Sequence, residues 1–193
     1  MITESPKGNE ALNFPNALTL TRILLIPVFI FSVVSSLEYG LLLATVIFLT
    51  ASATDVLDGY IARRHSQVTV LGRLLDPVAD KLLVMAALFL LVDMDRVIVW
   101  VAIIIVGREL AVTALRALAA SQNLIMAADT TGKYKMFLQI VAIVSLLLQD
   151  EAIAFLDLHM LGSLCLYASM ILAVVSGIQY TVQLWKHMSS RQH

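Results

Sequence analysis

The amino-acid sequence predicts an all-α, polytopic membrane protein with six transmembrane helices and both termini in the cytoplasm. Of its residues, 60% are hydrophobic and only 14% are charged, and its mean hydropathy is +0.88. Soluble domains average about 45–50% apolar and about 25% charged residues. Apolar runs near the roughly 20 residues that a helix needs to cross a bilayer recur along the whole chain. Lys and Arg fall almost entirely in alternate connections between these runs.

Each apolar run defines one expected helix. The six helices are expected over residues 17–37, 39–65, 70–92, 97–120, 131–148 and 158–185. Pro77 lies inside the third run and should kink that helix, because proline removes a backbone hydrogen bond. The length suits a single domain, with a polar segment at 1–16, a six-helix bundle at 17–185 and a polar tail at 186–193. The first run is too long for the core of a signal peptide.

The charges assign an orientation to these helices. The connections after the first, third and fifth helices contain Glu38, Asp93, Asp95, Arg96, Asp150, Glu151 and Asp157. All of the 13 Lys and Arg residues except Arg96 fall at the opposite ends of the helices. Because basic residues accumulate on the cytoplasmic side, that side is expected to hold both termini.

Four aspartates between residues 55 and 80, here called the aspartate segment, lie at the expected cytoplasmic ends of the second and third helices. Asp55 and Asp58 are three residues apart, and Asp76 and Asp80 are four apart, so each pair shares one helix face. Carboxylates are costly near lipid and mutually repulsive unless cations compensate them. Their oxygens suit a hard cation such as Mg²⁺ or Mn²⁺, and two such ions would neutralise the four.

An alternative is that the aspartates cap helices or pair with basic neighbours. The candidate partners are Arg63, Arg64, Arg73 and Lys81. Burying four acids for structure alone is costly, which favours the metal site. Gly59 directly follows Asp58, and Gly72 precedes Asp76 by one turn. Both glycines leave room for a ligand or a backbone to approach closely.

The aspartate segment resembles a family signature at every fixed position. Asp55-x-x-Asp58-Gly59-x-x-Ala62-Arg63, eight further residues, and Gly72-x-x-x-Asp76-x-x-x-Asp80 is similar to the motif of the CDP-alcohol phosphotransferases. The resemblance implies an integral membrane enzyme that joins a CDP-activated group to an alcohol and releases CMP. It further implies that Asp55, Asp58, Asp76 and Asp80 bind two metal ions, with Asp80 also the general base.

The resemblance also implies residues that hold the CDP moiety. Gly59, Arg63 and Thr69 are implied by the signature itself. Asn16 and Thr19 belong to a PN-x-L-T-x-x-R opening of the first helix, which is typical of phosphatidylglycerophosphate synthases within this family. Asn16 or Thr19 would alternatively cap that helix.

A basic pocket is expected at the same cytoplasmic end. Arg108 and Arg116, eight residues apart, share one face of the fourth helix, and Lys133 and Lys135 open the fifth. Such a set suits an anionic second substrate, for which glycerol 3-phosphate fits. The lysines would alternatively serve topology or bind anionic headgroups, and Arg108 would alternatively pair with Glu109.

The GRE and GK-x-K…Q patterns around these cations again resemble phosphatidylglycerophosphate synthases, with Met136 departing from the expected small hydroxyl residue. The expected substrates are therefore CDP-diacylglycerol and glycerol 3-phosphate, in a bacterial cytoplasmic membrane. Rivals within the family would use phosphatidylglycerol, inositol phosphate or serine as the acceptor. A rival of another class is a cation-coupled transporter, but transporters usually place their sites near the midplane between repeated halves.

Three further features of the sequence indicate which partners and cross-links to expect. The net charge of −1 gives no indication of nucleic acid. Cys165 is the single cysteine, so no disulfide forms within the chain. Small residues line the last helix and are expected to serve helix packing or a homodimer contact. They are Gly162, Ser163, Ser169, Ser176 and Gly177.

Overall fold

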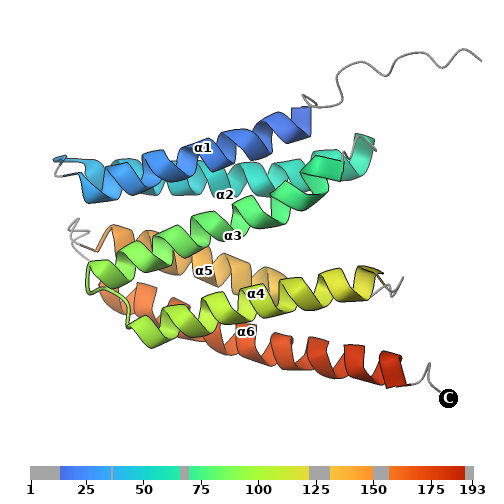
Figure 1. Cartoon of the computed structure of the whole chain (residues 1–193). Helices are drawn as coiled ribbons and strands as arrows, with labels where there is room; N and C mark the ends of the chain where they lie inside the picture. Colours follow the sequence, from blue (N-terminus) through green and yellow to red (C-terminus); the bar gives the residue numbers. More distant parts are fainter. Residues whose placement is uncertain (1–13, 36, 66–69, 122–130, 150–156, 190–193) are drawn as a thin grey trace, which may run out of the picture. The chain divides into compact units, whose positions relative to one another are not determined.

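The computed structural model describes residues 14–35, 37–65, 70–121, 131–149 and 157–189. Every regular element in those ranges is an α-helix (Figure 1). The helices are α1 (Phe14–Val34), α2 (Gly40–His65), α3 (Val70–Asp93), α4 (Val99–Ser121), α5 (Thr131–Leu147) and α6 (Leu158–Ser189). Each expected helix corresponds to one of them, with its ends shifted by four residues or fewer, so the all-α prediction is confirmed.

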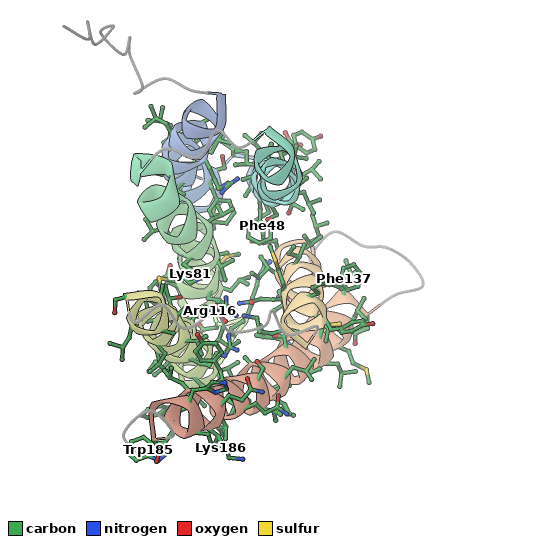
Figure 2. The ribbon with its side chains drawn as sticks, turned by 90° about the vertical axis from the view of Figure 1, so that its right-hand side faces the viewer. Phe48, Lys81, Arg116, Phe137, Trp185 and Lys186 are labelled. Atoms are coloured by element: carbon green, nitrogen blue, oxygen red, sulfur yellow. The ribbon has the colours of Figure 1, made fainter. Side chains whose placement is uncertain are left out.

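The membrane character is clearest in α6. Its stretch Leu158–His187 is long and apolar enough to cross a membrane, and Leu20–Val34 and Gly40–Thr54 are shorter apolar helices. Large apolar side chains are exposed on several helices, among them Trp100 and Trp185. Phe137 is 67% exposed and points outward from α5 (Figure 2). Large apolar side chains exposed in such number suit contact with lipid or protein rather than water. Six spans with cytoplasmic termini stay a prediction.

The residues group into two compact units, 1–84 and 85–193. In the first unit, α1 packs against α2. The rings of Phe29 and Phe48 lie 6.1 Å apart between centroids. A Cβ at Gly40 would lie 2.5 Å from the backbone oxygen of Ser32. Only glycine therefore allows this close approach where the chain turns from α1 into α2.

In the second unit, α6 packs against both α5 and α4. A Cβ at Gly162 would lie 2.7 Å from Cγ of Leu146 and 3.1 Å from the backbone oxygen of Ala142. Gly162 thus lets α5 and α6 approach closely. The helix-packing interpretation of this glycine is confirmed.

The turn between α3 and α4 ties this second unit together. Asp95 adopts a left-handed conformation with φ of 57°, and the next residue is Arg96. The Nη1 of Arg96 donates to the carbonyls of Leu146 (2.7 Å) and Leu147 (3.0 Å) at the end of α5. Because the last carbonyls of a helix lack partners within it, Arg96 acts as a side-chain cap.

Candidate functional site

The aspartate segment lies on two regular helices. Asp55 and Asp58 belong to α2, and Asp76 and Asp80 belong to α3. Their helical backbone confirms that each pair lies about one turn apart on one helix face. Their side chains lie outside the described residues.

The residues predicted to hold CDP are placed only by their helices. Asn16 and Thr19 fall in the first two turns of α1, and Gly59 and Arg63 fall in the last two turns of α2. Their side chains, like the whole of Thr69, lie outside the described residues. Their predicted roles therefore stay predictions.

The donor set of the aspartate segment fits a hard divalent cation. Four carboxylates supply oxygen ligands only, and two pairs at helical spacing can offer them from two helix faces. Among the side chains that the structure describes, no three His, Cys, Asp or Glu residues lie together as a metal site requires. The four aspartates are not among those side chains.

Two cations of the predicted basic pocket lie in a charged cluster on α4 and α5. It consists of Arg108, Glu109 and Lys135, and we call it the Glu109 cluster. One oxygen of Glu109, Oε1, accepts from Nη1 of Arg108 at 3.0 Å and also pairs with Nζ of Lys135. The side chains of all three residues are 16% exposed or less. Since buried charges are costly unless paired, the shared carboxylate stabilises both cations.

Arg108 is also anchored to α6. Its Nε donates to the carbonyl of Ala173 at 2.6 Å, and its Nη2 donates to Oγ of Ser176 at 2.5 Å. A Cβ at Gly177 would lie 3.3 Å from both Cγ and Nε of Arg108. The guanidinium therefore donates to two acceptors on α6, and Gly177 leaves the space that the arginine side chain needs. We call Ala173, Ser176 and Gly177 the Arg108 contact surface.

The remaining two predicted cations are exposed. Arg116 stacks over the ring of Tyr180 on α6, with Cζ 5.6 Å from the ring centroid. Lys133 is exposed at the start of α5. Arg108 contacts Ala173 and Ser176 while Arg116 contacts Tyr180, so α4 and α6 run in the same direction along this contact.

The four predicted cations thus divide into two kinds. Arg108 and Lys135 are largely buried and share Glu109. The Arg108–Glu109 pair, expected from the sequence as an alternative, is therefore present. Arg116 and Lys133 are accessible. None of these contacts tests a role in binding substrate, and the basic pocket stays a prediction.

Sequence reasoning missed the part that α6 plays. Ser176 and Gly177 were expected to serve only helix or dimer packing, and Tyr180 was not considered. Ser176 and Gly177, about one turn before Tyr180, were a weak signal for an arginine contact. A glycine leaves space for a long side chain, and the neighbouring serine offers it a hydroxyl acceptor. Nothing in the sequence connected this run to Arg108.

A polar group on α5 extends the cluster by one turn. Gln139 follows Lys135 by four residues, so both lie on the same helix face. Gln139 is 5% exposed, and its Nε2 has no hydrogen-bond partner within the part of the chain that the structure describes. The buried face of the first half of α5 is therefore polar, although most residues of the second half are apolar.

A groove of about 330 Å³ runs between α4 and α6 beside Arg108. Its walls are mostly apolar and include Leu115 and Val174, and Thr181 contributes a hydroxyl. The guanidinium of Arg108 thus lies at the border between an apolar groove and the charged Glu109 cluster.

Comparison with known proteins identifies relatives along nearly the whole chain. The family model described as CDP-alcohol phosphatidyltransferase matches residues 12–178, which include the aspartate segment and the Glu109 cluster. A relative from Bacillus subtilis (strain 168) is 38% identical over 190 residues, covering 92% of this chain and 98% of the relative. It is named CDP-diacylglycerol–glycerol-3-phosphate 3-phosphatidyltransferase.

Two further relatives carry the same name. The Pseudomonas fluorescens protein is 38% identical over 185 residues, covering 93% of each chain. The Rickettsia felis protein is 34% identical over 168 residues, covering 87% of this chain and 93% of the relative. Because the family model matches residues 12–178 and these relatives match 87–93% of the sequence, the chain belongs to the CDP-alcohol phosphatidyltransferase family.

Proposed function

We propose that this protein transfers the phosphatidyl group of CDP-diacylglycerol to sn-glycerol 3-phosphate, giving phosphatidylglycerophosphate and CMP in phospholipid biosynthesis. The observation that carries the proposal is the similarity over 87–93% of the chain to relatives named for this reaction. The complete aspartate signature within the matched family region supports the same chemistry. The enzyme class is a CDP-alcohol phosphotransferase.

The aspartate segment is the proposed metal centre. The family is generally dependent on divalent metal, and Asp55, Asp58, Asp76 and Asp80 would hold two ions of Mg²⁺ or Mn²⁺. Divalent ions bound there would neutralise the pyrophosphate and the charge that develops during transfer. The carboxylates would hold these ions in place, and the ions would supply the positive charge that binds the anionic pyrophosphate of the donor.

Asp80 has a second proposed role as general base. Its carboxylate accepts the proton of the 1-hydroxyl of glycerol 3-phosphate, and the hydroxyl oxygen forms a bond to the β-phosphorus attached to diacylglycerol. The bond from that phosphorus to the CMP oxygen breaks, and CMP leaves. Arg63 compensates the charge of the leaving group, while Gly59, Thr69, Asn16 and Thr19 hold the CDP moiety.

The acceptor phosphate is proposed to bind the cations of α4 and α5. Arg116 and Lys133 are exposed and able to meet it directly. Arg108 and Lys135 already share Glu109, but each terminal nitrogen of the Arg108 guanidinium carries a second N–H that its contacts to Glu109 and Ser176 do not use. A fixed guanidinium suits a phosphate, since its planar fork binds two oxygens together.

The rival acceptors are less well supported. Serine lacks a phosphate, so these cations would have no anionic group of the acceptor to bind. Inositol phosphate and phosphatidylglycerol each carry a phosphate, so the cations do not exclude them. The relatives' names favour glycerol 3-phosphate over all three. Membership of this family argues against the cation-coupled transporter.

We further propose that the protein is a multi-pass enzyme of the cytoplasmic membrane. The six spans are inferred from the apolar runs, and the cytoplasmic termini and cytoplasmic site from the distribution of Lys and Arg. A homodimer is proposed from the exposed apolar surface alone, because most of the small residues of α6 are buried against α4 and α5.

The direct test is CMP release from CDP-diacylglycerol by purified protein in detergent with Mg²⁺. Glycerol 3-phosphate, phosphatidylglycerol, inositol phosphate and serine are compared as acceptors. Release that depends on glycerol 3-phosphate supports the proposal, and release with another acceptor instead replaces it. Metal-dependent ion uptake into vesicles without any CDP-lipid would restore the transporter.

A further inference from the structure

We propose that the Arg108 contact surface of α6 is a positioning element for the acceptor site, with Ser176 as its main residue. It holds the guanidinium of Arg108 in the orientation that binds the phosphate of glycerol 3-phosphate. This inference rests on the proposed function, because it assigns a purpose to an arginine that the proposed function uses. It assigns α6 a part in recognising the acceptor, although that helix contains no residue of the family signature.

The contacts define the plane and rotation of the guanidinium. Nε donates to the carbonyl of Ala173, Nη2 donates to Oγ of Ser176, and Nη1 donates to Glu109. Every nitrogen of the group therefore has a fixed acceptor. Arginine side chains lose much rotamer entropy when they bind a ligand, so an arginine already held in place binds a phosphate more tightly.

Ser176 is buried, and the orientation of its hydroxyl suits it to accept from Arg108. It is 5% exposed, and its hydroxyl lies 3.3 Å from the carbonyl of Ala173, to which it donates. That hydroxyl proton is therefore directed to the backbone, which leaves the oxygen lone pairs for Nη2 of Arg108. Removing the hydroxyl would leave a buried N–H of a charged group without its acceptor.

Gly177 contributes space beside the same side chain. A Cβ there would lie 3.3 Å from Cγ and Nε of Arg108 and 3.6 Å from Cγ2 of Val112. A contact of 3.3 Å with two atoms of a side chain held by three acceptors forces that side chain to shift. An alanine at this position is therefore expected to rotate the guanidinium rather than to unfold the helix pair.

The chain offers a matched control on the same helix. Ser169 is 1% exposed, and its hydroxyl donates to the carbonyl of Leu166 three residues earlier, as that of Ser176 does to Ala173. Ser169 differs in that, among the described residues, Arg108 donates its α6 side-chain hydrogen bond to Ser176 and not to Ser169. Ser169→Ala thus measures the loss of a buried serine hydroxyl from α6 without the loss of an arginine acceptor.

The experiment measures steady-state kinetics of Ser176→Ala, Gly177→Ala and Ser169→Ala in detergent, with thermal unfolding of each variant. Ser176→Ala is expected to raise KM for glycerol 3-phosphate about tenfold, as loss of a hydrogen bond to a charged group would. KM for CDP-diacylglycerol is expected to stay within about twofold, and unfolding to match Ser169→Ala. Gly177→Ala is expected to raise the same KM by a smaller factor.

A double-mutant cycle tests whether Ser176 acts through Arg108. In an Arg108→Lys background the guanidinium is absent, so adding Ser176→Ala is expected to change KM for glycerol 3-phosphate by less than about twofold. An undiminished effect in that background would overturn the proposal. Equal shifts of both KM values, or an equal effect of Ser169→Ala, would also overturn it and identify Ser176 as structural.

The outcomes separate this inference from the proposed function. If the unmodified protein releases CMP only with a different acceptor, the proposed function fails. If glycerol 3-phosphate is the acceptor and Arg108→Lys raises its KM while Ser176→Ala does not, the proposed function stands and the inference fails.

Discussion

The aspartate segment and the Glu109 cluster are assembled from the chain in different ways. The aspartates lie in one short stretch, on adjacent helices, and their spacing within each pair is set by helical geometry. The Glu109 cluster joins Lys135 to Glu109 across 26 residues, and its Arg108 reaches Ala173 of the Arg108 contact surface across 65. A site built from local spacing can therefore be predicted from the sequence, whereas one built from distant contacts cannot.

The largest expected effect tests the local site. Asp80→Asn removes the proposed base and one metal ligand, and should lower kcat for CMP release by about a thousandfold or more, because a positioned base alone contributes about 10²–10⁴-fold. The measurement is turnover at saturating CDP-diacylglycerol and glycerol 3-phosphate. Asp93→Asn is the control, since Asp93 is an exposed acid at the other end of the same helix. Comparable turnover of the two variants would contradict a catalytic aspartate segment.

The next largest effect is on stability and tests the contacts within the Glu109 cluster. Glu109→Gln leaves the largely buried Lys135 and Arg108 without their shared carboxylate and should destabilise the protein by about 2–4 kcal/mol. Thermal unfolding followed by tryptophan fluorescence in detergent measures this change. Adding Lys135→Met should recover part of the loss, because it removes one of the two positive charges that Glu109 compensates. A double variant that is as unstable as the sum of the two single variants would show that the pair is not coupled.

A smaller effect tests helix packing without touching any predicted site residue. Gly162→Ala would place a Cβ 2.7 Å from Cγ of Leu146 and should destabilise the protein by about 1–3 kcal/mol. Gly107→Ala is the matched stability control, because nothing lies within 4 Å of its added Cβ. That variant should be stabilised by up to about 1 kcal/mol through helix propensity. Equal unfolding temperatures for the two variants would contradict the close α5–α6 approach.

The smallest effect concerns the turn that positions Arg96. Asp95 has φ of 57°, a conformation that glycine adopts more readily, so Asp95→Gly should stabilise the protein by about 0.5–1 kcal/mol. Asp93→Gly should do the opposite, because Asp93 ends α3 within the helix. Thermal unfolding of the pair gives the sign directly. A loss of stability in Asp95→Gly would mean that its side chain, not its backbone, matters at this turn.

The sequence alone determined the helices, the family and the spacing of the aspartates. Apolar runs defined α1 to α6 to within four residues, because helix length and hydropathy depend on neighbouring residues only. The aspartate motif was readable for the same reason, since its spacing within each pair is one helical turn. The pairing of Arg108 with Glu109 was open as an alternative because those two residues are adjacent.

Tertiary structure decided which partners the charged residues take. Three contacts depend on which helices pack together. Glu109 joins Arg108 to Lys135, and Arg108 contacts Ser176 and Gly177. Arg96 caps the end of α5. Residues such as Ser176 looked like ordinary packing positions, because a small residue in an apolar helix has the same appearance whatever it faces. A charged side chain in a low-polarity environment must find an acceptor, and only the packing of α4, α5 and α6 determines which acceptor lies within reach.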